Sequence, residues 1–314
     1  MARLGLCMVG PGSIAGEHLS ALKVIDRTRN RWVVGRSAES AAEFAGHWGF
    51  DHSTSSLGEA LLDPGVDVVF ICSPNALHAG QAEMALQAGK HVVVEIPLAM
   101  NVDQSRALVA LSAQSRRSLQ VCHTMRSFAA IRYVRSLHTS GRDRITQIVG
   151  FFGIPRRNNM GFSGLRSWAD DLLWHHAGHL VDASLWTLGI EEICSPHLIR
   201  GPVNENLHMT MDLNLAFSSD EGCVIGHSLT YNTAELVWEM RFICESGNYL
   251  FRNGDLFNQN RERVVEGRSI RDLEPQNRQV LQHIMSGEPS DFEASGVVPS
   301  LNCLQRLQET AEVA

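Results

Sequence analysis

Lysine is nearly absent from this sequence of 314 residues. Only Lys23 and Lys90 occur among the 27 basic residues, and all the others are arginine. The formal net charge is −7 at pH 7, which argues against nucleic acid or an anionic membrane as the main partner. Any step that needs a lysine amine therefore has two candidates only.

Paired cysteines and long apolar runs are also missing. The seven cysteines are odd in number, widely spread, and include no Cys-x-x-Cys pair, which is typical of reduced thiols in a cytoplasmic protein. The N-terminal apolar run stops at Pro11, too soon for a signal peptide or a membrane span. With 44% hydrophobic residues, the chain is long enough for about two domains with cores of their own.

A glycine turn stands close to the N-terminus. An apolar run over residues 3–9 ends at Gly10, and helical spacing follows over residues 13–25. The turn matches G-x-G-x-x-A through Gly10, Gly12 and Ala15, which suits a tight turn, close approach of a pyrophosphate, and close helix packing. We expect the phosphates to lie at the helix N-terminus; the alternative is a tight turn that binds nothing.

Strands and helices alternate through the first 122 residues. Predicted strands at 31–35, 66–72, 91–95 and 119–122 are separated by predicted helices at 38–48, 76–88 and 101–117. This order predicts a parallel, doubly wound Rossmann sheet, with ligands bound beyond the carboxyl ends of its strands. The predicted cofactor contacts are Gly10, Gly12, Ser13, Ile14, Ala15, Arg36, Ser37, Cys72, Ser73, Pro74, Asn75, His78, Glu95, Ile96 and Pro97.

The end of the second strand bears on which nicotinamide cofactor is bound. It reads Gly35, Arg36, Ser37, with no carboxylate until Glu39. An acidic residue there would accept hydrogen bonds from ribose hydroxyls, whereas an arginine pairs with a 2′-phosphate. This favours NADP over NAD. In the alternative reading, Ser37 caps the next helix and Arg36 is solvated.

Residues 123–314 have a different pattern. Strand-like runs follow one another between residues 193 and 263, and helices are predicted at 274–285 and 298–313. Consecutive strands without helices between them indicate an antiparallel sheet. We therefore predict a second, α+β domain with an open antiparallel sheet. The uncovered face of such a sheet commonly meets a second subunit, so a homodimer or homotetramer is expected.

The segment 168–182, WADDLLWHHAGHLVD, is the strongest candidate for chemistry. On an α-helix, its His175, His176 and His179 would share a face with Asp171 and Asp182. Imidazole titrates near neutral pH and suits general base catalysis. The alternatives are hydrogen-bonded core histidines, a solvated face, or the metal site of a hydrolase or oxygenase.

An arginine-rich loop precedes these histidines. Arg156, Arg157 and Arg166 occur with Asn158 before the next acidic residue, Asp170. A guanidinium pairs with a carboxylate through two parallel hydrogen bonds. The loop therefore predicts an anionic small-molecule substrate and argues against a neutral sugar; the alternative is that these arginines only keep the loop soluble.

The chain resembles the glucose-fructose oxidoreductase / inositol dehydrogenase family over nearly its whole length. The resemblance lies in the glycine turn, in Glu95-Ile96-Pro97, and in a His-rich helix before an antiparallel sheet. Most of that family has Glu-Lys-Pro at this place, and its lysine transfers the proton. This chain has Ile96 instead, and neither Lys23 nor Lys90 can take over that role. The resemblance then implies His175 and His179 as candidate bases, and His176 as a group that binds substrate or orients a partner.

A narrower group within the family accounts for that departure. EIPLA at 95–99, HT at 123–124, RRNNM at 156–160 and RSW..DLLWHHAGH at 166–179 resemble the 2-hydroxy-4-carboxymuconate semialdehyde hemiacetal dehydrogenases of the protocatechuate 4,5-cleavage pathway. This implies NADP-dependent oxidation of a carboxylated cyclic hemiacetal to 2-pyrone-4,6-dicarboxylate. Met125 and Arg126 replace two adjacent arginines, so Arg126 is expected to supply one carboxylate contact and a second is missing. The remaining alternatives are a sugar or dihydrodiol dehydrogenase and an NADPH-binding regulator without activity.

Overall fold

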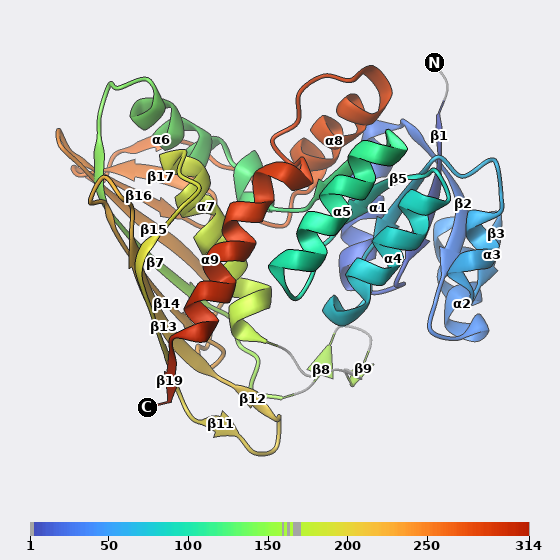
Figure 1. Ribbon diagram of the computed structural model, residues 1–314, viewed down its shortest axis with the longest axis horizontal. Helices are drawn as coiled ribbons and strands as arrows, with labels where there is room; N and C mark the ends of the chain where they lie inside the picture. Colours follow the sequence, from blue (N-terminus) through green and yellow to red (C-terminus); the bar gives the residue numbers. More distant parts are fainter. Residues whose placement is uncertain (1–2, 159, 162–163, 166–170, 314) are drawn as a thin grey trace. The chain divides into compact units, whose positions relative to one another are not determined.

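The computed structural model describes residues 3–158, 160–161, 164–165 and 171–313. The chain divides into two compact units (Figure 1). The first contains Met1–Cys122 and Arg271–Val298, and the second contains His123–Ile270 and Pro299–Ala314. Residues 271–298 therefore return to the first unit, whereas the division expected from the sequence placed them in the second domain.

The first unit is built on a parallel sheet, as predicted. Its described strands follow the order β3-β2-β1-β4-β5-β6, and every neighbouring pair is parallel. The order changes direction between β1 and β4, which is where doubly wound sheets bind ligands. The strands are β1 (Leu4–Val9), β2 (Thr28–Val34), β3 (His52–Thr54), β4 (Val68–Ile71), β5 (His91–Val94) and β6 (Leu119–Val121).

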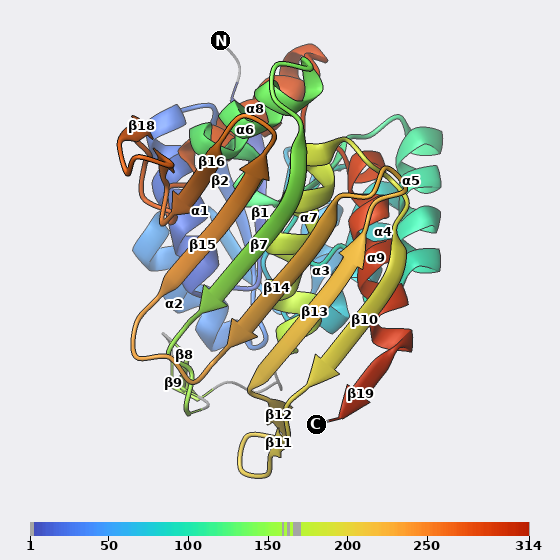
Figure 2. The same cartoon turned by 90° about the vertical axis from the view of Figure 1, so that its left-hand side faces the viewer.

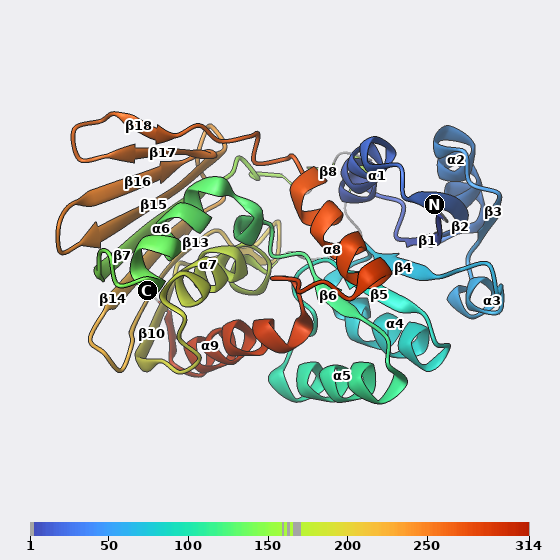
Figure 3. The ribbon, with the colours of Figure 1, turned by 90° about the horizontal axis from the view of Figure 1, so that it is seen from above.

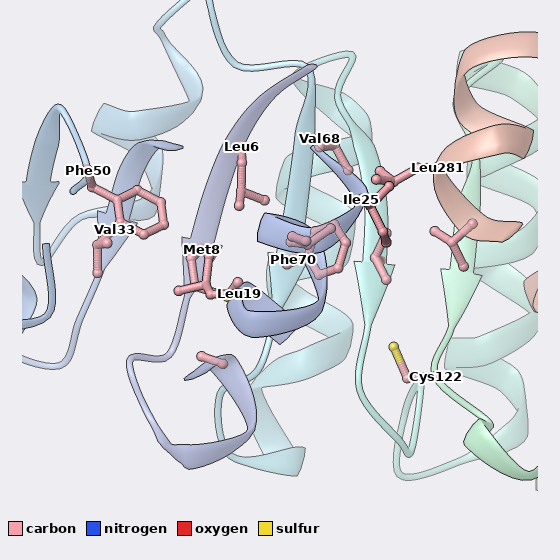
Figure 4. Close-up of a cluster of buried hydrophobic side chains, with 14 of the residues drawn as sticks. Leu6, Met8, Leu19, Ile25, Val33, Phe50, Val68, Phe70, Cys122 and Leu281 are labelled. Atoms are coloured by element: carbon pink, nitrogen blue, oxygen red, sulfur yellow. The ribbon is translucent and has the colours of Figure 1, made fainter. Parts of the chain in front are cut away.

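Helices complete this unit. Ser37 and Asn101 cap two of them, and residues 271–298 add a helix that packs on α1. Leu281 of that helix joins the buried cluster around Leu6, Met8 and Phe70 (Figure 4), so the returning segment belongs to this core. The helices are α1 (Ser13–Ile25), α2 (Ala38–Trp48), α3 (Leu57–Leu61), α4 (Asn75–Gln87), α5 (Val102–Ser115), α8 (Glu274–Ser286) and the short η3 (Ala294–Val297).

The second unit contains a large sheet with the described order β18-β17-β16-β15-β7-β14-β13-β10-β19 (Figure 2). It is mixed rather than purely antiparallel, because β7 pairs with β14, and β10 with β19, in parallel. The strands are β7 (Ile145–Gly153), β10 (Cys194–Arg200), β13 (Asp212–Ser218), β14 (Val224–Thr230), β15 (Val237–Cys244), β16 (Asn248–Arg252), β17 (Asp255–Asn258), β18 (Arg263–Val265) and β19 (Ala311–Val313).

Helices cover one face of this sheet (Figures 1 and 3). They are η1 (Thr124–Ser127), α6 (Ala129–Thr139), η2 (Leu172–Ala177), α7 (Gly178–Leu188) and α9 (Val298–Glu309). The helix expected over 298–313 is too long, because residues 311–313 pair with β10 as an edge strand. The other face exposes Val149 and Val224, and its contact with a second subunit stays a prediction. No described helix has the length and apolar character needed to cross a membrane.

Candidate active site

The glycine turn of the first unit has the geometry that a dinucleotide requires. Gly10 has a φ of +88°, and a Cβ there would lie 2.6 Å from the backbone nitrogen of Ser73, so only glycine fits. A Cβ on Gly12 would meet nothing within 4 Å. The first turn of α1 has no acidic residue and no side-chain cap, which leaves its N–H groups suited to an anion. Ala15 is fully buried, as the third position of the motif demands.

Arg36 and Ser37 both lie on the surface beyond β2. Ser37 caps α2, since its Oγ accepts a hydrogen bond of 3.2 Å from the N–H of Ser40. This is the structural role that the sequence left open for it. The exposed Arg36 is then the residue whose charge bears most directly on the choice between NADP and NAD.

His78 connects the two loops that follow β4 and β5. Its Nδ1 lies 2.8 Å from the carbonyl oxygen of Pro97, and its Nε2 lies 2.7 Å from that of Ser73. The ring is 1% exposed. His78 therefore lies among the predicted cofactor contacts. Both of its ring nitrogens face carbonyl oxygens of the protein, so the ring holds the two loops together.

Glu95 is held by a histidine that sequence reasoning did not assign to the site. The Nε2 of His18 lies 2.8 Å from Glu95 Oε1, and its Nδ1 lies 3.0 Å from Asn277 Oδ1. His18 is fully buried. Both ring nitrogens of His18 thus lie within hydrogen-bond distance of a side-chain oxygen, and the ring fixes the position of the Glu95 carboxyl group. The only sequence signal for His18 is a polar residue on the buried face of α1.

The thiols near Glu95 are protonated rather than reactive. Burial, reinforced by the Glu95 charge, raises the pKa of both Cys72 and Cys122 well above the ordinary thiol value, and thiols are nucleophilic only as thiolates. His18, Glu95 and Cys122 form the one group of possible metal ligands in the described part of the chain. The direct hydrogen bond between His18 and Glu95 accounts for their closeness, and the histidines of the predicted metal site form no such group there.

Both lysines lie where the sequence placed them. Lys90 is buried just before β5, and its Nζ donates hydrogen bonds of 2.9 Å to the carbonyl oxygens of Asp63 and Val66. Lys23 is exposed in α1. The amine of Lys90 is thus engaged by backbone at the amino end of the strand, whereas Glu95 follows the carboxyl end.

The histidines of the second unit do not lie along one α-helical face. Residues Leu172–Ala177 form the π-helix η2, and α-helical geometry begins only at Gly178. The wider turn brings the neighbours His175 and His176 into a stack, with ring centroids 4.1 Å apart. π-helical turns occur frequently at functional sites. The prediction of a regular helical stripe was therefore wrong, although His175 and His176 are brought together.

The three imidazoles differ in their surroundings. His176 is 8% exposed, stacks on Phe152, and places its Nδ1 2.9 Å from the hydroxyl of Tyr231. His175 and His179 are only partly buried. His179 packs edge-on against Trp238, with ring centroids 5.1 Å apart. His175 and His179 are therefore the better placed to exchange protons, and His176 is built into the packing.

The two carboxylates predicted to accompany the histidines have other partners. Asp171 caps η2, because its side chain accepts hydrogen bonds from the N–H groups of Leu173 and Trp174. Asp182 is fully buried in α7 and accepts hydrogen bonds from Arg126, at 2.8 Å from Nε and 2.6 Å from Nη2. Neither carboxylate is hydrogen-bonded to the three predicted histidines in the described contacts.

Arg126 is 3% exposed and forms a bidentate ion pair inside the protein. Ser300 Oγ also donates to Asp182, at 2.6 Å, and His123 Nδ1 lies 3.3 Å away. Burial raises the pKa of Asp182, but the charges of Arg126 and His123 and the hydrogen bonds from Arg126 and Ser300 outweigh it, so the net shift is downward. The carboxylate that Arg126 binds in this structure is thus Asp182, while its contact with a substrate remains a prediction.

The arginine-rich loop lies beside the end of β14. The N–H of Arg156 donates a 3.0 Å hydrogen bond to the carbonyl oxygen of Tyr231, and its guanidinium lies 5.3 Å from the centre of that ring. Arg157 donates to the carbonyl oxygen of Asn232. Asn158 is exposed, and Arg166 lies outside the described residues. Tyr231 thus contacts both a predicted catalytic histidine and a predicted substrate arginine, and no local sequence signal singled it out.

Comparison with known proteins gives the family. Residues 4–123 match the oxidoreductase family with an NAD-binding Rossmann fold, and residues 130–268 match the C-terminal domain of bacterial oxidoreductases. The 4-carboxy-2-hydroxymuconate-6-semialdehyde dehydrogenase of Sphingobium sp. (strain NBRC 103272 / SYK-6) is 34% identical over 97% of this chain and 96% of its own.

Two other relatives match less sequence or at lower identity. The 1,5-anhydro-D-fructose reductase of Ensifer adhaerens is 35% identical over 45% of this chain and 42% of its own. A levoglucosan dehydrogenase, solved with NADH and levoglucosan, superimposes with a TM-score of 0.86 over 98% of this chain and 97% of its own at 18% identity. The chain is therefore an oxidoreductase with an NAD-binding Rossmann fold, and it belongs to the glucose-fructose oxidoreductase / inositol dehydrogenase family.

Proposed function

We propose that the protein oxidises the cyclic hemiacetal of 4-carboxy-2-hydroxymuconate semialdehyde to the lactone 2-pyrone-4,6-dicarboxylate, with NADP as the oxidant. The observation that carries this proposal is the relative with that semialdehyde in its name, which matches 97% of the chain. The presence of Ile96 in place of the family's usual lysine supports it, together with His175, His176 and His179 within five residues and the stack of the first two. The sequence resemblance to the same group points the same way.

The cofactor fits the first unit. Gly10 and Gly12 would let the pyrophosphate approach the backbone closely, and the N–H groups of the first turn of α1, beginning at Ser13, would hold it. Arg36 would pair with the 2′-phosphate. When bound, NADP supplies the acceptor for the hydride that leaves the ring carbon. Glu95, fixed by His18, is proposed to accept a hydrogen bond from the bound cofactor at the carboxyl edge of the sheet.

The histidines supply the base. Loss of the hemiacetal hydroxyl proton as the hydride departs leaves a ring ester, so the carbon is oxidised and no covalent intermediate is required. A neutral imidazole takes up this proton near its own pKa. His175 and His179 are the partly exposed candidates, and the hydrogen bond to Tyr231 orients His176.

The substrate carboxylates call for cations. Arg156, Arg157 and Arg166, with Asn158, are proposed to bind them. The Nε and Nη2 groups of the buried Arg126 donate hydrogen bonds to Asp182. Arg126 is therefore proposed to contact the substrate through another of its N–H groups. A second candidate function, oxidation of a neutral sugar, is favoured by the close structural likeness to levoglucosan dehydrogenase. It predicts no need for these arginines.

The test is a spectrophotometric assay of NADP reduction with freshly generated ring-cleavage product, and separately with levoglucosan. We expect turnover with the first only. We expect one of the variants His175→Ala and His179→Ala, the one that removes the base, to lower kcat by about 10²–10⁴-fold. The control His47→Ala, at an exposed histidine, should leave kcat unchanged. Equal turnover in all three variants would exclude both His175 and His179 as the base, and turnover with levoglucosan alone would favour the sugar.

We also propose a homodimer or homotetramer, because the sheet of the second unit leaves one face without helices (Figure 2). Val149 and Val224 are exposed on the strands of this sheet. Native mass spectrometry at micromolar concentration should show the oligomer. A purely monomeric spectrum would contradict this.

A further inference from the structure

A cavity of about 430 Å³ opens at the amino-terminal edge of the parallel sheet, within the first unit. His91, which begins β5, and Leu119, which begins β6, are among its lining residues. The predicted cofactor contacts follow the carboxyl ends of the strands, as Glu95 follows β5. The cavity is therefore separate from the dinucleotide site and lies at the opposite edge of the sheet.

Positive charge predominates in the lining. Arg116 and Arg117 are both exposed, and neither has an ion pair or a side-chain hydrogen bond with any residue that the structure describes. One acidic residue, Glu293, occurs in the described lining, and its Oε1 lies 3.6 Å from His283 Nδ1. The sequence as a whole is acidic, yet it has no Asp or Glu over residues 104–142.

His91 presents a fixed donor to this region. Its Nδ1 accepts a 3.0 Å hydrogen bond from the backbone N–H of Ser118, so the proton of the neutral ring is on Nε2. Burial lowers the pKa of His91, and the charge of Arg117 lowers it further; Asp67 opposes this shift and His283 adds to it. The cavity thus has a positive potential that its own residues do not balance.

We propose that this cavity binds a small dianion through the guanidinium groups of Arg116 and Arg117, with the Nε2–H of His91 as a further donor. Guanidinium groups match paired oxygens of carboxylate and phosphate, and the volume lies in the range of small-molecule sites. A phosphate monoester and a compact dicarboxylate share this chemistry. A neutral ligand would leave the charge unbalanced, which is why an anion is the expected occupant.

The experiment is calorimetric titration of the full chain with sodium phosphate and, separately, with sodium succinate at constant ionic strength. Saturating NADP is present throughout, so that the glycine turn is filled. We expect at least one of the two anions to bind with a Kd on the order of 1 mM. The anion that binds more tightly shows whether the ligand is a phosphate ester or a dicarboxylate. Arg116→Gln/Arg117→Gln should weaken binding about tenfold or more.

The matched control is Arg106→Gln, an exposed arginine of α5, the helix that ends just before Arg116; Arg106 does not line the cavity. It should bind like the unaltered chain. Equal weakening in both variants, or none in the double variant, would overturn the proposal. A second readout uses the unaltered chain alone: NMR titration of the His91 ring should show its pKa rise when the anion is added, and an unchanged pKa would also overturn it.

Discussion

The buried pair Arg126–Asp182 offers a sharp test of what stabilises the second unit. Both side chains are at most 4% exposed, and Asp182 also accepts a hydrogen bond from Ser300. Asp182→Asn keeps the size of the side chain but leaves the guanidinium without a counter-charge. Because removal of one partner of a buried ion pair typically costs 3–5 kcal/mol, we expect a loss of about 3–5 kcal/mol in the free energy of unfolding.

The assay is urea unfolding followed by tryptophan fluorescence, since the ring of Trp186 lies 5.9 Å from Arg126. Replacing both charges, as Arg126→Met/Asp182→Leu, should recover most of the loss, because no charge is then left unpaired. The control is Asp26→Asn at the exposed pair with Arg3, where we expect a change below about 1 kcal/mol.

Two outcomes would refute this reasoning. If Asp182→Asn cost no more than Asp26→Asn, the buried pair would not be a determinant of stability. If the double variant were as unstable as the single one, the cost would come from lost packing rather than from an uncompensated charge.

The other predictions concern pH, packing and cofactor choice. Hydrogen bonds, the largest effect coming from the backbone N–H of Gly65, lower the pKa of Asp63 from 3.8 to about 2. The ionised Asp63 should therefore stabilise the fold fully above pH 3.8, and this stabilisation should be lost as the pH falls toward 2. In acid unfolding, Asp63→Asn should lack this part of the pH dependence. Gly150→Ala would place a Cβ 2.4 Å from the ring of the buried His227 and should cost about 1–3 kcal/mol by urea unfolding, whereas Gly46→Ala, with open space around it, should not destabilise. Arg36→Ala should raise the KM for NADP about tenfold and leave that for NAD unchanged, since only NADP has a 2′-phosphate; equal changes would assign Arg36 no role in the choice.

Local sequence pattern was sufficient for most elements and for the family. Strand, turn and helix around Gly10 follow from spacing and from the conformational freedom of glycine, and both act over a few residues. The strand β3 was missed because its three residues, His52–Thr54, form no apolar run. The end of α9 was misplaced because an edge strand pairs residues 311–313 with a distant part of the chain.

Tertiary structure decided the partners. His18, Glu95 and Asn277 meet although up to 259 positions separate them, and Asp182 pairs with Arg126 across 56. Periodicity shows which face of an element is buried, but not which side chain of another element lies opposite. The π-helical turn at His175 likewise has no signature in hydrophobic spacing, because its geometry arises from packing. Residue types therefore indicated the chemistry, while long-range packing selected which carboxylate, imidazole and guanidinium came together.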